Sequence, residues 1–219
     1  MPASDAVFLS ASVPDEKRAP EFAKTADVVA ITSAVNAVMQ VILGRRRLVW
    51  GGHPAITPIV LLVAKSMKVD YGQWVHLYQT AYFKDEFPED NAHFENVTYT
   101  GVVENDREES LLAMRKAMFS SGKFQAAVFI GGMKGIIDEF DLFSSIQPEA
   151  RLVPIYSTGG ATLELKGRMK RDDPALTNDL DYVGLLHAQL GISKRERRYV
   201  SPAEQPRKLE DRYRQRHKG

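Results

Sequence analysis

The sequence contains no cysteine among its 219 residues. A disulfide scaffold, a thiol nucleophile and a cysteine metal site are therefore excluded. No apolar run approaches the length of a membrane-spanning helix, and the first residues lack the charged and apolar regions of a secretory signal. The histidines have no mutual spacing that would form a metal site, so we expect no metal and no cofactor. We expect a soluble, cytoplasmic protein without a membrane partner.

The near-neutral net charge of +1 conceals an uneven distribution. Residues 194–219 contain ten Lys or Arg and four Asp or Glu, so they carry +6 and the remaining chain carries −5. A basic segment can contact nucleic acid, an acidic partner or only water. Tyr199 and Tyr213 are its aromatic residues, which gives no interleaved stacking platform of the kind that single-strand binders use. We predict one domain at 1–190, followed by a basic tail at 191–219 that is flexible or bound to a partner.

The hydrophobic content of 44% allows one substantial core. Short apolar runs alternate with segments of helical period. The expected strands are 7–9, 47–50, 74–78, 97–99, 126–130 and 151–155. The expected helices are one capped by Asp27 and ended by Gly44, one starting after Asn105 or Asp106 and ending at Phe119, and those over 56–67, 136–146, 161–168 and 182–190; segments 14–24, 84–95 and 172–181 are expected to connect them. This order predicts a single Rossmann-like α/β domain, with a mostly parallel sheet and helices on both faces.

One strand-to-helix junction is typical of a phosphate-binding loop. The apolar run Val128–Ile130 passes into Gly131, Gly132, Met133, Lys134 and Gly135, and an amphipathic helix follows. Glycines let the backbone approach an anion, while unpaired N–H groups and the positive dipole end attract it. Tight packing is the alternative reading of such a turn. Ligand binding is favoured because other turns are expected to converge on it.

Three more small-residue turns follow apolar runs. They contain Ser10 and Ser12, then Gly51, Gly52 and His53, and finally Thr158, Gly159 and Gly160. In a parallel sheet these turns gather in the crevice at the carboxyl ends of the strands. Each also has a simpler interpretation: the serines cap the turn, the glycines pack, and His53 is satisfied by the backbone. Tyr78, Gln79 and Tyr82 follow another strand and are weaker candidates for contacts with a base.

The four turns together resemble the signature segments of the SLOG superfamily, the Rossmann-like proteins that unite DprA with the LONELY GUY phosphoribohydrolases. The segments are Phe8–Pro14, Leu48–Pro58, Phe129–Gly135 and Ser157–Ala161, and the similarity covers residues 6–190. It is closest to the SLOG domains of bacterial conflict and nucleotide-signalling systems. The resemblance implies a Rossmann-like fold and a nucleotide-derived ligand.

Comparison with the phosphoribohydrolases implies roles for two charged residues. Their Arg-Lys-Ala segment matches Arg115-Lys116-Ala117, and their Gly-Gly-x-Gly-Thr-x-x-Glu loop is similar to the segment from Gly131 to Glu139. In those enzymes the arginine and the glutamate are implied to act at the ribosyl bond. This sequence departs from the pattern by one inserted residue before Gly135 and by Ile136 in place of the threonine.

The predicted ligand-binding residues combine the four turns with this comparison. They are Ser10, Ser12, Gly51, Gly52, His53, Gln79, Arg115, Gly131, Gly132, Met133, Gly135, Glu139, Thr158, Gly159 and Gly160.

Three functions follow from the resemblance, in descending order. The first is a sensor that binds a nucleotide-derived molecule in bacterial signalling or antiviral defence, acting as a homo-oligomer or through an effector protein. The second is a phosphoribohydrolase in which Glu139 and Arg115 are catalytic. The third is nucleic-acid binding, which only the basic tail favours.

Overall fold

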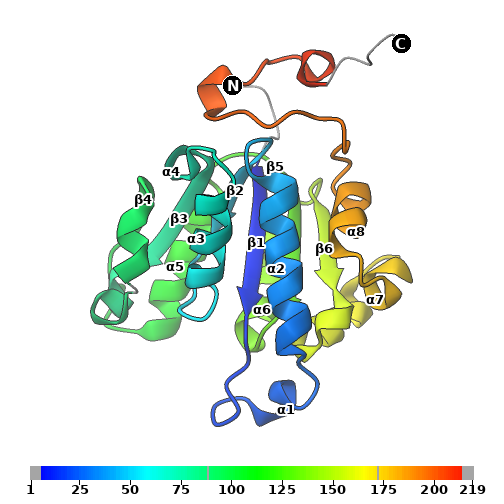
Figure 1. Cartoon of the computed structure of the whole chain (residues 1–219). Coiled ribbons are helices and arrows are strands. Elements are labelled where there is room, and N and C mark those ends of the chain that lie inside the picture. Colours follow the sequence, from blue (N-terminus) through cyan, green and yellow to red (C-terminus); the bar gives the residue numbers. More distant parts are fainter. Residues whose placement is uncertain (1–5, 88, 172, 214–219) are drawn as a thin grey trace, which may run out of the picture.

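A six-stranded sheet forms the centre of the computed structural model, which describes residues 6–87, 89–171 and 173–213. The strand order is β4-β3-β2-β1-β5-β6, and all five neighbouring pairs are parallel (Figure 1). The strands are β1 (Ala6–Ser12), β2 (Arg47–Trp50), β3 (Val75–Thr80), β4 (Asn96–Thr100), β5 (Phe124–Gly131) and β6 (Arg151–Ile155). The predicted Rossmann-like α/β domain with a parallel sheet is confirmed.

Helices cover both faces of the sheet. The longer ones are α2 (Val28–Ile42), α3 (Thr57–Ser66), α5 (Arg107–Phe119), α6 (Lys134–Ile146) and α8 (Tyr182–Gln189). Helices α2 and α3 lie on the front face in Figure 1, with α5 and α6 on the back. Three short helices are α1 (Pro20–Ala23), α4 (Tyr71–Trp74) and α7 (Ala175–Asn178); 3₁₀ helices span Ala81–Glu86, Glu89–His93, Tyr156–Thr158, Gly160–Arg168, Pro202–Glu204 and Leu209–Arg212. No helix in the described residues has the length and apolar character needed to cross a membrane.

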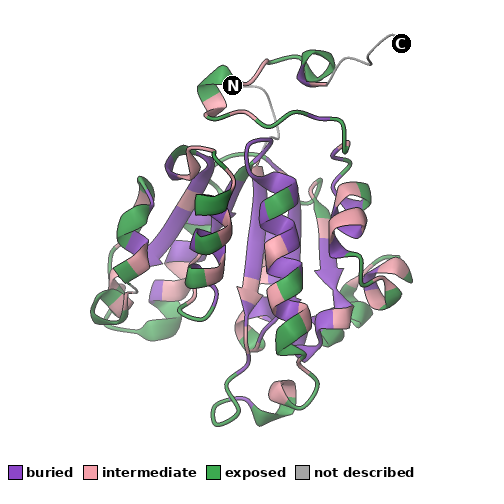
Figure 2. Cartoon of the chain, viewed as in Figure 1, coloured by how far each residue is buried: buried purple, intermediate pink, exposed green. Residues whose placement is uncertain are grey.

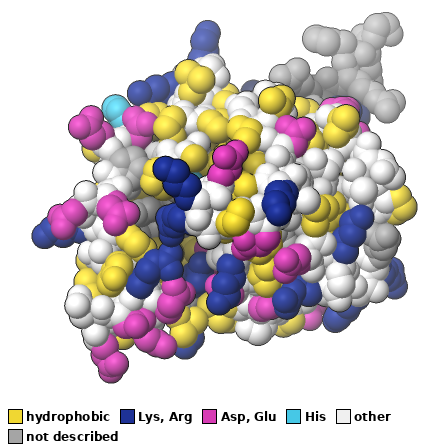
Figure 3. Space-filling model, turned by 90° about the horizontal axis from the view of Figure 1, so that it is seen from below, with side chains coloured by type: hydrophobic (Ala, Val, Ile, Leu, Met, Phe, Trp, Pro, Cys, Tyr) yellow, Lys and Arg dark blue, Asp and Glu magenta, His cyan; other side chains and the backbone are white. Residues whose placement is uncertain are grey.

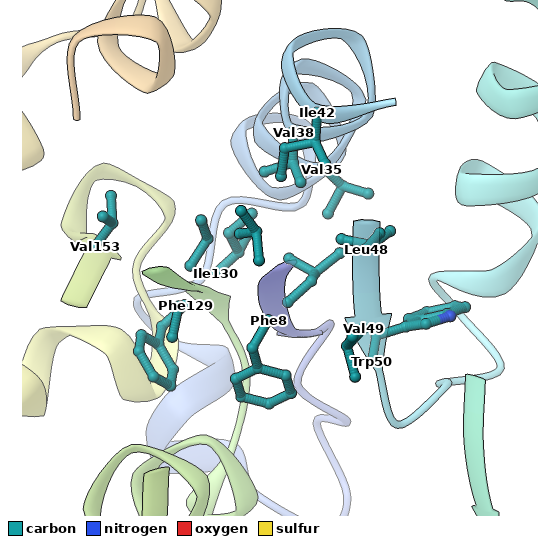
Figure 4. Packing of buried hydrophobic residues seen from close by; sticks show 14 of the residues in the cluster. Phe8, Val35, Val38, Ile42, Leu48, Val49, Trp50, Phe129, Ile130 and Val153 are labelled. Carbon is teal, nitrogen blue, oxygen red and sulfur yellow. The ribbon is translucent and has the colours of Figure 1, made fainter. Parts of the chain in front are cut away.

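The core consists of two layers because successive strand residues point to opposite faces. On the back, Phe8 stacks on Phe143 at a ring distance of 5.4 Å and meets the edge of Phe119 at 4.8 Å. On the front, Val35 and Val38 of α2 pack over the sheet (Figure 4). The central strands β1, β2, β3 and β5 are therefore buried almost throughout, whereas β4 at one side of the sheet has only half-buried and exposed residues (Figure 2).

Two helix starts follow from capping residues. Asp27 accepts a hydrogen bond from the Ala30 N–H at 2.9 Å, and Asp106 accepts one from the Glu109 N–H at 2.9 Å. Asp106, rather than Asn105, is therefore the N-cap of α5. Asn105 has a φ of 56°, which places it in the turn before the helix.

Several predicted element boundaries were wrong. Segment 14–24 contains α1, since Pro20 occupies a first-turn position where a missing N–H has no cost. The expected helix at 161–168 is a 3₁₀ helix, and Thr162 bonds the Gly159 carbonyl at 2.6 Å at its start. Trp74 ends α4 instead of starting a strand. Helix α6 begins two residues earlier than expected, at Lys134.

Short helices also occupy the other two predicted connections. The segment predicted as a loop at 84–95 contains the end of one 3₁₀ helix and the whole of another. Helix α7 interrupts the predicted linker 172–181, whose first residue lies outside the described residues.

The described part of the tail contacts the sheet edge opposite the carboxyl ends of the strands (Figure 1). Glu196 is 2% exposed and accepts hydrogen bonds from Arg46 at 2.6 and 3.1 Å. The Tyr199 N–H bonds the Gly44 carbonyl at 2.9 Å, and the Trp74 indole N–H bonds the Val200 carbonyl at 2.9 Å. Residues 191–213, the C-terminal segment below, are thus held by their own chain. Residues 214–219 lie outside the described residues.

Candidate ligand-binding site

A cavity of about 1180 Å³ opens at the carboxyl ends of β1, β2, β3 and β5. The chain leaves β1 toward α2 on one face and leaves the neighbouring β5 toward α6 on the other. The two connections diverge there, so a crevice forms at this edge of the sheet. Ser10, Ser12 and Met133 line it where β1 and β5 end.

Three polar side chains form a connected group in this cavity. Glu139 accepts a hydrogen bond from the Ser10 hydroxyl at 2.5 Å through Oε2 and one from Arg115 Nε at 3.1 Å through Oε1. Arg115 is 8% exposed, so its charge is balanced by a neighbour within the wall. Strand β1, helix α5 and helix α6 each supply one member, and the structure thereby brings together three predicted site residues.

Helix α6 begins at the cavity without a side-chain cap. Its N-cap residue is Met133, whose side chain cannot accept a hydrogen bond from the first turn. In contrast, aspartates cap α2, α5 and α8. Arg115 Nη2 lies 3.5 Å from the Gly135 carbonyl, directly beside this first turn. Backbone N–H groups and a guanidinium therefore face the same space, an arrangement suited to an anion.

The turn after β2 contributes a neutral histidine. Burial, together with the positive charge of Arg18, lowers the pKa of His53 from its ordinary value of 6.5. The Ala55 N–H donates to Nδ1 of His53 at 3.2 Å, which leaves the proton of the neutral ring on Nε2. Gln79 donates to the Gly51 carbonyl at 2.7 Å and fixes the same turn. Gly51, Gly52, His53 and Gln79 all line the cavity.

The cavity wall carries charges of both signs. The basic residues are Arg18, Arg107, Arg115 and Lys134, and the acidic ones are Asp15, Glu21, Glu86, Glu108, Asp138 and Glu139. Figure 3 looks onto this edge and shows Lys and Arg side chains interspersed with Asp and Glu. An anion would therefore find a local basic position beside Arg115 rather than a uniformly positive surface.

Five predicted site residues pack behind the wall and do not line the cavity. They are Gly131, Gly132, Thr158, Gly159 and Gly160. The Thr158 hydroxyl accepts the Gly131 N–H at 2.9 Å, and the Gly132 carbonyl accepts the Ala161 N–H at 2.9 Å. A side chain on Gly159 would collide with the Thr25 carbonyl, and one on Gly132 with Ile136. These glycines allow the end of β5, the turn after β6 and the segment before α2 to pack closely together. This packing supports the residues that line the cavity.

Sequence reasoning missed part of the wall. Phe83 and Phe87 come from segment 81–95, and Arg18 and Phe22 come from the segment after β1. The sequence could have indicated these residues, because both segments follow a predicted strand. Long connections that start at the carboxyl end of a strand pass over the crevice there. Tyr82 also lines the cavity, whereas Tyr78, the weaker candidate beside it, is buried and stacks on His76 at 4.6 Å.

The parallel sheet defines a Rossmann-like protein, and the cavity at the carboxyl ends of its strands is a candidate site for a small molecule. A comparison with protein families matches residues 21–190 to the SLOG cluster3 family. The chain therefore belongs to the SLOG cluster3 family, and this membership indicates a nucleotide-related function. The comparisons with curated proteins and with solved structures gave no match.

Proposed function

We propose that the protein binds a phosphorylated, nucleotide-derived molecule in the cavity and acts as a cytoplasmic sensor in bacterial signalling or defence. One observation carries this proposal: the uncapped start of α6 opens into the cavity beside the buried guanidinium of Arg115. Family membership supports a nucleotide-related ligand. Ligand occupancy would then change self-assembly or the contact with an effector protein.

The cavity has suitable groups for both ends of such a molecule. A phosphate fits the first turn of α6, where Arg115 and backbone N–H groups supply donors. Tyr82, Phe83 and Phe87 line another part of the wall and offer aromatic surface to a base. The Nε2–H of neutral His53 adds a donor without adding charge.

Hydrolysis of an N-glycosidic bond is the second candidate. The contact between Arg115 and Glu139 inside the cavity favours it, since a carboxylate and a cation are what an oxocarbenium-like transition state needs. However, Ser10 and Arg115 engage both carboxylate oxygens of Glu139. Ile136, at the position of the enzymes' threonine, is 3% exposed and packs beside Gly132. We therefore favour binding without turnover.

A thermal-shift screen tests the proposal with nucleoside phosphates, cyclic dinucleotides and ADP-ribose derivatives as probes. A ligand at a hundredfold excess over its dissociation constant should stabilise the protein by about 2.7 kcal/mol. The Arg115→Ala variant is the comparison, because it removes the guanidinium beside the first turn of α6. Stabilisation of both proteins to the same extent would contradict binding at α6.

The Glu139→Gln variant separates the sensor from the enzyme. For a sensor, wild type should release no free base from nucleotides, and the variant should change only the affinity. For a hydrolase, the variant should retain binding and lose about 10²-fold to 10⁴-fold in turnover. Chromatography of nucleotides incubated with each protein measures this. Base release by wild type that Glu139→Gln abolishes would refute the sensor.

A further inference from the structure

The two outer strands of the sheet, β4 and β6, differ in how well their free sides are protected against pairing with another strand. At β6, Pro154 lies within the strand and lacks a backbone N–H, and Arg151 donates to Gln189 of α8 at 2.6 Å. Prolines and covering elements are the usual means of preventing another strand from pairing with an edge. The β6 edge is therefore blocked against further pairing.

The β4 edge carries no such protection. Its five residues, Asn96 to Thr100, include neither a proline nor a charged residue, and β4 is the outermost strand on the left of Figure 1. Tyr99 is 58% exposed on this edge. An uncharged strand rich in β-branched and aromatic residues is suited to pair with another strand through its free backbone groups.

The order of side chains along β4 is symmetric about Thr98. Asn96 and Thr100 are polar, Val97 and Tyr99 are apolar, and Thr98 lies at the centre. When such a strand pairs antiparallel with a copy of itself, each residue meets one of the same polarity. No like charges oppose each other. The strand is therefore self-complementary in an antiparallel pair, and a second copy of the chain is a suitable partner for it.

We propose that β4 pairs antiparallel with β4 of a second copy around a twofold axis at Thr98. The two sheets would then form one continuous sheet across an isologous interface. In this register Val97 lies opposite Tyr99 of the partner subunit, and the axis generates the same pair twice. Aromatic and β-branched residues form favourable cross-strand pairs.

Nearby residues extend the surface and connect it to the cavity. Val102 is 46% exposed and follows β4 directly in the chain, and Tyr82 is 37% exposed in the 3₁₀ helix that follows β3, the strand paired with β4. The Phe87 ring lies 5.6 Å from that of Tyr99 and also lines the ligand cavity. A residue of the proposed interface, Tyr99, therefore contacts a residue of the cavity wall, Phe87. The proposed pairing does not itself depend on a ligand.

Sedimentation over a concentration series tests the surface and its register together. Wild type should dimerise reversibly, and Val97→Glu should raise the dissociation constant about tenfold or more by removing both symmetric pairs. The double variant Val97→Glu/Tyr99→Lys should recover most of this loss, because each carboxylate then meets an ammonium. Leu62→Glu, on the exposed side of α3, is the control and should match wild type.

A wild type that stays monomeric up to its solubility limit would overturn the proposal. A dimer that Val97→Glu leaves intact would overturn it as well. Val97 is half-buried and packs against the core, so circular dichroism of each variant must show that the fold is retained. If Val97→Glu unfolds, the Thr98→Cys cross-link described next decides the proposal.

Cross-linking tests the axis directly, since the chain has no native cysteine. Directly opposed residues in antiparallel strands have Cα atoms about 4.5 to 5.5 Å apart, within the range of a disulfide. Under mild oxidation, Thr98→Cys should therefore form a covalent dimer and Leu62→Cys should not. Equal cross-linking of both variants, or none at Thr98→Cys, would contradict the twofold axis at Thr98.

Discussion

Arg115 combines burial with an orientation toward the cavity. Its Nε atom is held by Glu139, and Nη2 lies near the Gly135 carbonyl. Within the described part of the chain, Nη1 has no hydrogen-bond partner. A buried guanidinium with an unused donor is prepared for an anionic oxygen, because the cost of its burial is already met by the pair with Glu139.

The Arg115→Ala variant should weaken binding of a phosphorylated ligand about tenfold to a hundredfold, the scale of a hydrogen bond to a charged group. The dephosphorylated counterpart should lose much less. Arg107→Ala is the matched control, since Arg107 also lines the cavity but pairs with Glu108 at an exposed position. Calorimetry measures both ligands. Equal losses for the two ligands would indicate that Arg115 acts through packing.

The lowered pKa of His53 has a consequence for stability. Burial lowers it first and the charge of Arg18 second. Below about pH 6.5 the unfolded chain binds a proton that the folded ring resists, so stability falls as the pH drops from 6.5 through the folded pKa. Above pH 6.5 the contribution is fully present. Burial also lowers the pKa values of His76 and His187, which adds to the same acid sensitivity.

The His53→Asn variant should therefore lose less unfolding free energy than wild type between about pH 7.5 and pH 5.5. Asparagine retains an acceptor for the Ala55 N–H but does not titrate. Urea unfolding at the two pH values gives the comparison. In addition, Arg18→Ala should raise the pKa of His53, which NMR of the ring follows. A His53 pKa at or above 6.5 in wild type would contradict the electrostatic account.

At the scale of elements, the turn after β6 fixes the relation of three segments. Gly159 has φ 68° and ψ −155°, a conformation open almost only to glycine. The hydroxyl of its neighbour Thr158 accepts a hydrogen bond from the N–H of Gly131, the last residue of β5, while the Gly160 N–H donates to the Thr25 hydroxyl at 3.2 Å. The turn thus joins β5, β6 and the segment before α2. This packing positions the start of α6 without contacting the cavity.

The Gly159→Ala variant should be destabilised by about 1 to 3 kcal/mol from the backbone conformation alone. The clash with the Thr25 carbonyl should add to this loss. Gly167→Ala is the control in the following 3₁₀ helix, because a Cβ there meets no atom within 4 Å. Thermal unfolding compares the two. A Gly159→Ala protein as stable as Gly167→Ala would show that the segments can separate without cost.

At the scale of the whole molecule, the C-terminal segment packs at the amino ends of the strands, on the side of the sheet opposite the cavity. Glu196 lies between Arg46 and Arg212, with the Arg212 Nη1 atom at 3.8 Å. All three side chains are at most 5% exposed. Removing one member of a buried ionic group leaves the others uncompensated, which costs far more than an exposed pair contributes.

The Glu196→Ala variant should therefore lose about 3 to 5 kcal/mol of unfolding free energy. Denaturant unfolding measures this loss. Glu210→Ala removes the exposed partner of Lys208 in the same segment and should leave stability unchanged. If Glu196→Ala unfolds at the same denaturant concentration as wild type, the C-terminal segment does not contribute to the stability of the domain.

Local patterns were sufficient to predict much of the fold. Asp27 at a helix start and the apolar run before Gly131 each depend on neighbours in sequence, and both predictions are confirmed. The 3₁₀ form of Gly160–Arg168 was not predicted, because the helical spacing of its residues does not by itself distinguish a 3₁₀ helix from an α-helix. The site was predicted only in part for a related reason. The glycine at Gly132 indicated that another group approaches the backbone there, but whether a ligand or the Ile136 side chain fills that space depends on tertiary packing.

The sequence alone determined the alternation of strands and helices, and with it a parallel sheet whose turns meet at one edge, because periodicity and turn residues act locally. Only the tertiary structure decided which residues face the cavity. Arg115, Glu139 and Ser10 come from different elements, and Thr158 to Gly160 pack behind the wall. The tertiary structure likewise decided where the basic tail packs. The buried ion pair between Arg46 and Glu196 joins residues 150 positions apart, so it depends on the completed fold.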